Sequence, residues 1–300
     1  MTGIDPAQAL KEFEPQHDFF VGVDSDGSAF DTAGIKQREC FCPWMIGYFG
    51  LQPVAELARQ CKDFADLFSK SRGGNRHITL KRILVELLPN HPQVKARGFQ
   101  VPQLSHYFEW VDAPDSVLSN DGLKQAVERA EGAAREELEL VLKWSERVDW
   151  AIGEIVRDLP PFPFVRESLE KMQGQADIIV VSSTPVTALT REWNEHDIAR
   201  YVSVIAGQEQ GSKAQHLKYA TAGRYDKTHV LMVGDAPGDL KAARANGVLF
   251  YPILPGREGE SWQRFHDEAF DKFCDGRYTG GYEAGLIAEF DACLPEAPPW

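Results

Sequence analysis

The stretch FFVGVDSDGS, residues 19–28, decides the fold of this 300-residue chain. Its first half is an unbroken run without polar residues that ends abruptly at Asp24. Such a run is typical of a strand buried on both faces of a parallel sheet. Helical patterns separate the later runs in the second half of the chain, and strands that alternate with helices predict an α/β domain with a parallel sheet. The later apolar runs of the same form lie at 178–181, 202–206, 229–233 and 248–251.

Residues 33–160 follow a different pattern. Apolar residues recur there at helical spacing, almost no strand pattern is present, and a long helical run is predicted over 123–159. The sequence therefore predicts an α/β core formed by residues 1–32 and 161–300, interrupted after its first strand by an all-helical insert. Two more helices, without an assigned position, are predicted near 260–274 and 283–293.

The charge balance disfavours one class of partner. The chain has 32 Lys and Arg against 45 Asp and Glu, a net charge of −13, and such a chain repels the phosphate backbone of nucleic acids. Its five cysteines are an odd, sparse set, typical of intracellular thiols rather than of a disulfide framework. The N-terminus has no apolar signal segment, and no apolar run approaches the roughly 20 residues that span a bilayer. We therefore expect a cytoplasmic protein that binds neither nucleic acid nor membranes.

Polar residues with catalytic potential stand at or near the ends of the predicted strands. In an open parallel sheet, ligands bind outside the carboxyl ends of the strands, so these residues can share one pocket. Each also has an ordinary explanation: a solvated turn, a helix N-cap or a surface lysine. The residues are Asp24 and Asp26, Ser182 and Ser183, Lys213 at the start of a predicted helix, and Asp235 and Asp239.

The order and placement of these clusters resemble the haloacid dehalogenase-like superfamily of phosphohydrolases. The resemblance rests on FFVGVDSDGS, on IIVVSS at 178–183, on Lys213 and on LMVGDAPGDLKAARANGV at 231–248. It implies a three-layer, Rossmann-like parallel sheet core. The helical insert at 33–160 stands where that family places a mobile helical cap domain.

The resemblance implies a role for each residue of the catalytic group. Asp24 would be the nucleophile that forms an aspartyl-phosphate, and Asp26 would protonate the leaving group and then activate water. Ser182 and Lys213 would bind the phosphoryl oxygens. Ser183 is the alternative to Ser182 as the phosphoryl contact.

The resemblance also implies a magnesium ion. Asp24, the main-chain carbonyl of Asp26 and Asp235 would bind it, and Asp239 would act through water or by orienting Lys213. A few carboxylates, with phosphate and water, are the oxygen ligands that Mg²⁺ prefers. Without the metal, several acids in one pocket would repel each other and the substrate.

Asp26 separates the reaction classes of the family. Its dehalogenases lack an acid two residues after the nucleophile, because a halide leaving group needs no proton, and its phosphonatases generally lack one as well. Asp26 therefore favours hydrolysis of a small phosphorylated metabolite; sugar phosphates, nucleotides and phosphoglycolate-like acids all fit. The alternatives are a phosphomutase, which shares the same motifs, and a catalytically idle ligand-binding protein, which need not keep the full set of acids.

A basic island lies within the insert at residues 70–98. It has seven Lys and Arg but one acid, and the stretch SRGGNRHITLKR, residues 71–82, is its most notable part. Because arginine forks suit phosphate and carboxylate, Arg72 and Arg76 are predicted to bind the substrate. The alternative is a solvated loop whose charges pair with the acidic helical segment within 109–160.

Overall fold

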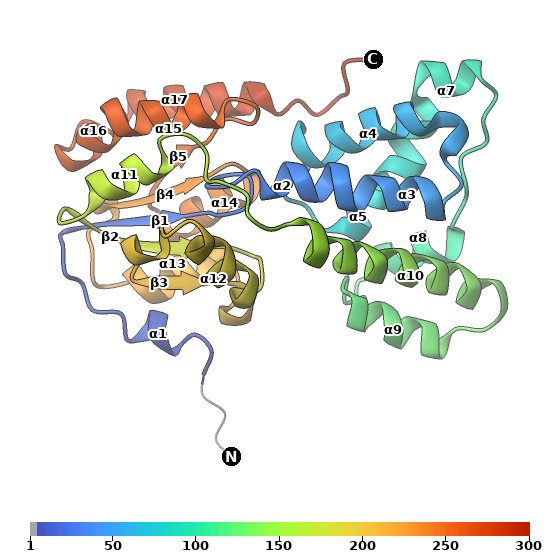
Figure 1. The fold of residues 1–300 in the computed structure, drawn as a ribbon, viewed down its shortest axis with the longest axis horizontal. Helices are drawn as coiled ribbons and strands as arrows, with labels where there is room; N and C mark the ends of the chain where they lie inside the picture. Colours follow the sequence, from blue (N-terminus) through green and yellow to red (C-terminus); the bar gives the residue numbers. More distant parts are fainter. Residues whose placement is uncertain (1–4) are drawn as a thin grey trace. The chain divides into compact units, whose positions relative to one another are not determined.

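The computed structural model describes residues 5–300, which divide into two compact units (Figure 1). Unit 1 contains the chain up to Ala33 together with Asp158–Leu294, and unit 2 contains Gly34–Arg157 together with Pro295–Trp300. The predicted boundaries differ from these by one residue at the first crossing and by three at the second. None of the helices in residues 5–300 combines the length and the apolar character that a membrane span requires.

Unit 1 is built on a five-stranded parallel sheet with the order β3-β2-β1-β4-β5. The central strand β1 pairs with β2 on one side and with β4 on the other. The predicted parallel sheet is therefore confirmed, and each strand overlaps one of the apolar runs in the sequence. The strands are β1 (Phe19–Val23), β2 (Ala176–Val181), β3 (Val204–Ala206), β4 (Val230–Gly234) and β5 (Leu249–Pro252).

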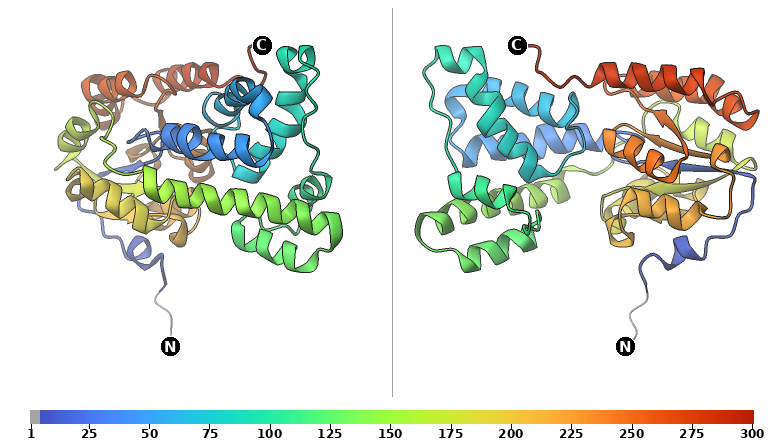
Figure 2. Two further views of the ribbon diagram at one scale, coloured as in Figure 1. Left: turned by 45° about the vertical axis from the view of Figure 1, so that its right-hand side comes forward. Right: turned by 180° about the vertical axis from the view of Figure 1, so that it is seen from behind.

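Helices cover both faces of this sheet, which gives the expected three-layer, Rossmann-like core (Figure 2). Successive residues of β1 serve opposite faces: Val21 and Val23 belong to one apolar cluster, and Phe20 belongs to the other. The first face packs against α11 (Val165–Met172), α12 (Val186–Glu195), α15 (Glu258–Arg264) and α16 (Phe270–Cys274). The second packs against α1 (Gln8–Lys11), α13 (Lys213–Thr221) and α14 (Pro237–Asn246), while α17 (Gly281–Cys293) contacts β5.

The helices near 260–274 and 283–293, which had no position from sequence alone, complete these two layers. A π-helical segment, Phe265–Ala269, joins α15 to α16. Short 3-10 turns elsewhere in unit 1 span Ala199–Tyr201, Gln208–Gln210 and Lys227–His229.

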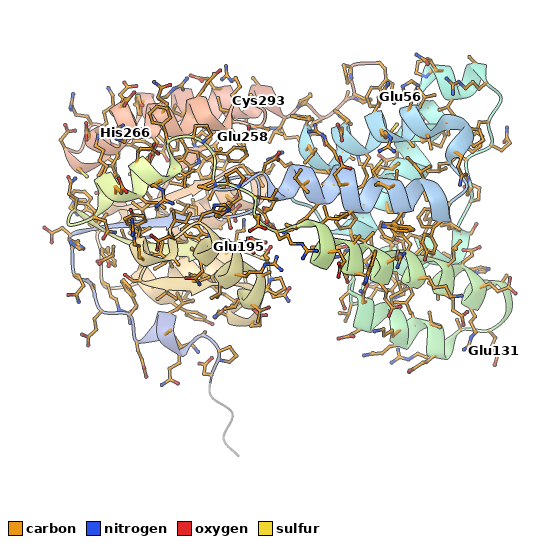
Figure 3. All side chains as sticks on the ribbon, viewed as in Figure 1. Glu56, Glu131, Glu195, Glu258, His266 and Cys293 are labelled. Atoms are coloured by element: carbon orange, nitrogen blue, oxygen red, sulfur yellow. The ribbon has the colours of Figure 1, made fainter. Side chains whose placement is uncertain are left out.

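Unit 2 is helical, as its apolar spacing predicts. The prediction of one continuous helical run over 123–159 is wrong in one respect. The structure has two helices there, and the first of them starts at Asn120. Glu131 adopts an extended backbone and Gly132 a φ of +54°, so the chain turns between α9 (Asn120–Arg129) and α10 (Gly132–Ile155), where Figure 3 labels Glu131. The helices are α2 (Thr32–Ile35), which begins in unit 1, α3 (Cys42–Tyr48), α4 (Ala55–Leu67), α5 (Arg76–Arg82), α6 (Leu88–Asn90), α7 (Pro92–Ala96), α8 (Ser105–Asp112), α9 (Asn120–Arg129) and α10 (Gly132–Ile155), with π-helical segments at Lys36–Phe41 and Ile83–Leu87 and a 3-10 turn at Gln52–Val54.

The tail Pro295–Trp300 corrects the predicted domains, which placed it in the core. The ring of Trp300 packs against Phe64 and His91, with centroids 5.6 and 5.1 Å apart. The N–H of Lys70 donates to the first carbonyl of the tail at 3.3 Å. These contacts assign the tail to unit 2. No periodic pattern in so short a segment could have indicated its partner.

His77 gives the stability of unit 2 a pH dependence. Its side chain is fully buried, with Nδ1 3.1 Å from the hydroxyl of Tyr107. Burial, and then the charge of Arg76, lower the pKa of His77 to about 4. Because the ordinary value is about 6.5, the unfolded chain takes up the proton first. We expect the free energy of unfolding to decrease by about 3 kcal/mol as the pH falls from about 6.5 to about 4.

Urea unfolding between pH 7 and pH 4 measures this effect. The acid-induced loss should be smaller in His77→Gln than in the wild type, because the variant has no imidazole to protonate. His106→Gln is the matched control, since His106 is an exposed histidine of the same unit. An unchanged pH dependence in His77→Gln would contradict the prediction.

Candidate active site

The predicted residues of unit 1 stand at the carboxyl edge of its sheet. Asp24 directly follows β1, and its N–H donates to the carbonyl of Val233 at 2.9 Å, so the ladder of the sheet positions it. Ser182 directly follows β2 and donates in the same way to Ala206 at 3.0 Å. The parallel strands thus deliver their loops to one edge, where ligands bind in folds of this kind.

Three carboxylates and one ammonium form the centre of the site. Asp24, Asp235 and Asp239 each offer an oxygen within 4.8 Å of the others, and all three side chains are buried. Lys213 is the first residue of α13, and its Nζ lies 2.9 Å from Oδ1 of Asp24 and 2.6 Å from Oδ1 of Asp239. When ionised, three acids against one base leave this group with an excess of two negative charges.

Burial and mutual repulsion set the pKa values of this group. Burial, followed by the charge of Asp239, holds the pKa of Asp24 well above its usual range. Burial also raises the pKa of Asp239, against the lowering effect of Lys213. Burial alone would lower the pKa of Lys213, but Asp239 and Asp24 outweigh it and raise that pKa above its ordinary value. A cation added to the group would relieve the repulsion.

The position of Asp239 depends on a glycine. Asp239 lies in the first turn of α14, and its Oδ2 accepts the N–H of Ala236 at 3.0 Å. Its carboxylate packs directly against Gly234, where an added Cβ would lie 2.4 Å from Cγ of Asp239. A side chain at this position would therefore displace the acid that binds Lys213.

Gly234→Ala is expected to lower the free energy of unfolding by about 1–3 kcal/mol, the usual cost of overpacking a well-packed interior. Gly238→Ala is the matched control, because a Cβ there meets no atom within 4 Å. Thermal unfolding compares the two variants. Equal unfolding temperatures would show that Asp239 moves aside at no cost, against the prediction.

Two buried tryptophans that the sequence analysis missed hold the loop after β1. The indole N–H of Trp193 donates to Oγ of Ser25 at 3.0 Å, and that of Trp262 donates to the carbonyl of Ser28 at 2.8 Å. Gly27 turns the same loop with a φ of +78°, a conformation that favours glycine. Each tryptophan contact joins distant parts of the chain, so no local signal in the sequence points to it.

Asp26 stands apart from the three buried acids. Its side chain is partly exposed, and its Oδ2 accepts a hydrogen bond from the hydroxyl of Thr184 at 2.6 Å. Its Oδ1 accepts a second bond from the hydroxyl of Thr32. Neither threonine is among the residues predicted from the sequence. The predicted metal contact of Asp26 concerns its main-chain carbonyl, a different atom, and stays a prediction.

Ser182 and Ser183 occupy the loop between β2 and α12 and differ in exposure. Ser182 is buried, and its Oγ accepts the N–H of Thr184 at 3.2 Å. Ser183 is exposed. The first serine therefore shapes the turn but does not cap α12, whose N-cap is Pro185, and it also lies at the edge that holds Asp24. Which of the two contacts a phosphoryl group stays a prediction.

Arg72 and Arg76 belong to unit 2 and have structural partners there. Nη1 of Arg76 lies 2.7 Å from Oδ1 of Asp149 and donates to Oγ of Ser145 at 2.9 Å, both in α10. The buried Arg72 donates from Nη1 to the carbonyl of Leu67 at 2.7 Å. For Arg76 the structure matches the alternative, in which the charges of the basic island pair with the acidic helical segment. A role of either arginine toward a substrate stays a prediction.

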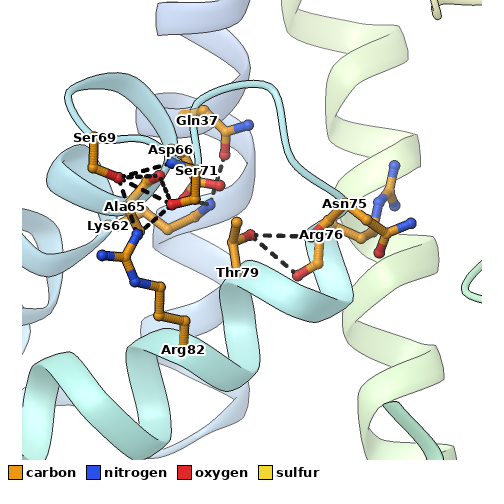
Figure 4. A network of polar contacts seen from close by, with 10 residues as sticks. All are labelled: Gln37, Lys62, Ala65, Asp66, Ser69, Ser71, Asn75, Arg76, Thr79 and Arg82. Carbon is orange, nitrogen blue, oxygen red and sulfur yellow. Dashed lines mark hydrogen bonds and ion pairs between the residues drawn. The ribbon is translucent and has the colours of Figure 1, made fainter. Parts of the chain in front are cut away.

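Arg82, a third member of the basic island, also has hydrogen-bond partners within unit 2. Its Nη1 donates to Oγ of Ser69 at 3.0 Å and to the hydroxyl of Ser71 (Figure 4). The same network holds Lys62, whose Nζ lies 2.6 Å from Oδ2 of Asp66 (Figure 4). These basic residues therefore tie the helices and loops of unit 2 together.

A family model agrees with the geometry of unit 1. The model for haloacid dehalogenase-like hydrolases matches residues 116–253, a range that holds Ser182, Lys213 and Asp235. The sheet brings Asp24, which precedes that range in the chain, to the same edge. Over residues 116–253 the chain matches the haloacid dehalogenase-like hydrolase family. The family indicated by the sequence motifs is thereby confirmed.

Solved structures match the chain at low sequence identity. A candidate phosphoglycolate phosphatase from Lactobacillus delbrueckii subsp. bulgaricus matches with a TM-score of 0.50 and 13% identity, over 87% of this chain and 99% of that chain. A predicted phosphoglycolate phosphatase from Haemophilus somnus matches with a TM-score of 0.45 and 15% identity, over 80% and 88%. A candidate β-phosphoglucomutase from Thermotoga maritima matches with a TM-score of 0.40 and 14% identity, over 86% and 98%. No curated protein matches the chain.

Proposed function

We propose that this chain is a magnesium-dependent phosphatase that hydrolyses a small phosphorylated metabolite through an aspartyl-phosphate. The observation that carries the proposal is the ion pair between Asp24 and Lys213, inside a buried group of acids at the carboxyl edge of the sheet. The match to a hydrolase family supports the reaction class. Asp26 supports ester hydrolysis over dehalogenation, because it provides an acid for the leaving group.

The acids of the site fit a divalent cation. Their carboxylate oxygens lie within 4.8 Å of one another, and hard oxygen ligands are those that Mg²⁺ binds. When ionised, the acids exceed Lys213 by two negative charges, which the two positive charges of such an ion would balance. In this proposal Asp24, Asp235 and the main-chain carbonyl of Asp26 hold it, while Asp239 orients Lys213, to which it is bonded. When bound, Mg²⁺ would neutralise charge on the phosphoryl oxygens.

The first half of the reaction forms the aspartyl-phosphate. A carboxylate oxygen of Asp24 attacks phosphorus, and the bond from phosphorus to the ester oxygen breaks. Asp26 gives its proton to that ester oxygen, so the alcohol leaves as a neutral molecule. Lys213 and Ser182 bind the phosphoryl oxygens during the transfer.

The second half of the reaction hydrolyses the aspartyl-phosphate and regenerates the enzyme. Water attacks the phosphorus of the aspartyl-phosphate, and Asp26, now ionised, accepts the proton of that water. Inorganic phosphate leaves, and the carboxylate of Asp24 is regenerated beside Lys213. Asp26 thus acts as acid and then as base, which requires its carboxylate to keep one position through both steps.

Phosphate release from a panel of esters tests the proposal. The panel contains a sugar phosphate, a nucleoside monophosphate, phosphoglycolate and p-nitrophenyl phosphate, each assayed with Mg²⁺ and with excess chelator. Release that requires the metal supports a phosphatase. No release, together with isomerisation of a sugar phosphate in the presence of a bisphosphate primer, would identify a phosphomutase. Binding without either reaction would identify an idle ligand-binding protein.

The proposal includes a location and a class of partner. All five cysteines are free thiols, which fits a reducing compartment, so we place the enzyme in the cytoplasm. The partner is a small phosphorylated metabolite rather than a nucleic acid, because the net charge of −13 disfavours a polyanion. We propose no membrane as a partner of the enzyme.

A further inference from the structure

Two threonine hydroxyls hold the two oxygens of the Asp26 carboxylate. Thr184 donates to Oδ2 at 2.6 Å from the loop after β2, and Thr32 donates to Oδ1 from the start of α2. Thr32 is fully buried. The two donors come from separate segments of unit 1, so rotation of the carboxylate would strain both bonds at once.

Contacts that do not involve Asp26 fix the position of Thr184. Its N–H donates to Oγ of Ser182 at 3.2 Å, and its carbonyl accepts the N–H of Gln208 at 3.1 Å. Gly207 allows this approach, because an added Cβ there would lie 2.5 Å from the carbonyl oxygen of Thr184. The loop is therefore braced against the segment after β3, and the hydroxyl is delivered to Asp26 by a backbone that is held elsewhere.

A threonine hydroxyl suits a residue that changes protonation state. A hydroxyl donates to a carboxylate and accepts from a carboxylic acid, so it can keep its bond after the proton has moved. A proton transfer also needs the acid within about 2.6–3.2 Å of the atom that receives the proton. A carboxylate held at both oxygens meets this requirement in both halves of the proposed reaction.

We propose that Thr184 and Thr32 are positioning residues that hold Asp26 for proton transfer to the leaving group. The inference rests on the proposed function, in which Asp26 is the acid and then the base. It adds two residues that act on the reaction through their hydrogen bonds to Asp26. Their effect is therefore on the step that needs a proton, while binding and phosphoryl transfer are otherwise unchanged.

The dependence of the rate on the leaving group tests this inference. The alcohol of an alkyl phosphate needs a proton to leave, whereas p-nitrophenolate leaves readily without one. Because kcat/KM reports the steps up to leaving-group departure, we expect Thr184→Val to lower kcat/KM for the best alkyl ester of the panel by about 10-fold or more. For p-nitrophenyl phosphate the fall should be less than about 3-fold, and Thr184→Ser should restore both rates.

A matched control separates positioning from loop stability. Thr228 donates from its hydroxyl to Oδ1 of Asp226 at the same distance of 2.6 Å, in the turn before β4 and away from the site. Thr228→Val should leave both substrates unaffected. Thr184→Ala and Thr32→Val should repeat the selective loss, which keeps the test valid if Thr184→Val folds poorly, and circular dichroism verifies the fold of each variant.

The outcomes distinguish this inference from the proposed function. An equal fall for the alkyl and the aryl ester in folded variants, or no fall for either, would overturn the positioning role while leaving the phosphatase intact. Absence of turnover by the wild type on every ester would overturn the proposed function and this inference with it. A loss confined to the alkyl ester, restored by serine, supports the inference.

Discussion

Asp24→Asn is expected to abolish phosphate release, with a fall in kcat/KM of about 10³-fold or more. An amide nitrogen is no nucleophile, and an amide oxygen is a much weaker one than a carboxylate. The same change removes the partner of Lys213 at 2.9 Å, so the variant loses the nucleophile and its ion pair together. Phosphate release with the best ester of the panel measures the effect.

A control is needed because Asp24 is buried and its replacement could affect folding. The variant should fold at least as well as the wild type without metal, because burial and the neighbouring Asp239 already raise the pKa of Asp24 and disfavour its charge. Asp226→Asn, in the turn before β4, should keep full activity. Residual turnover of Asp24→Asn near the wild-type rate would show that another group attacks phosphorus.

The strands were predictable because of how a parallel sheet is buried. Phe19–Val23 reads as an apolar run since both faces of β1 are covered, and the observed bounds agree with that run. The run 202–206 was less reliable. It lies at the edge of the sheet, where β2 is its only neighbouring strand within residues 5–300, and just Val204–Ala206 is a strand. A strand with one neighbour has fewer bonds to fix its ends.

The charged centre of the site was predictable for a related reason. Asp24, Asp235 and Lys213 stand near strand ends, and a parallel sheet brings those ends to one edge whatever the loops do. Thr184 was not predictable, because its hydroxyl reaches Asp26 only through the particular turn that its loop adopts.

The basic island could be located from the sequence, but the partners of its arginines could not. A cluster of arginines in the sequence indicates an affinity for anions, but it does not tell which anion is nearest in the fold. Arg76 meets Asp149 of α10 within its own unit. The cluster of arginines thus predicted that the partner of Arg76 carries a negative charge, but it did not identify that partner as Asp149. Trp300 is a similar case, since its contact with Phe64 crosses most of the chain.

Lys213→Met is expected to destabilise the folded protein in the absence of divalent cations, by about 3–5 kcal/mol. The methionine fills a similar volume but leaves Asp24 and Asp239 buried without the ammonium that bonds both of them. Lys218→Met is the matched control, because Lys218 is an exposed lysine of the same helix. Thermal and urea unfolding with chelator present compare the two variants.

Adding Mg²⁺ then separates the roles of the lysine and the metal. Since Asp24 and Asp239 of the variant have lost the ammonium that bonds both of them, Mg²⁺ should stabilise Lys213→Met more than it stabilises the wild type. Turnover should nevertheless stay about 10²-fold or more below the wild-type rate, because Mg²⁺ restores charge to the acids but not the donor that binds the phosphoryl group. Equal stabilisation of both proteins by Mg²⁺ would show that the ion binds elsewhere, and full recovery of turnover would remove Lys213 from the reaction.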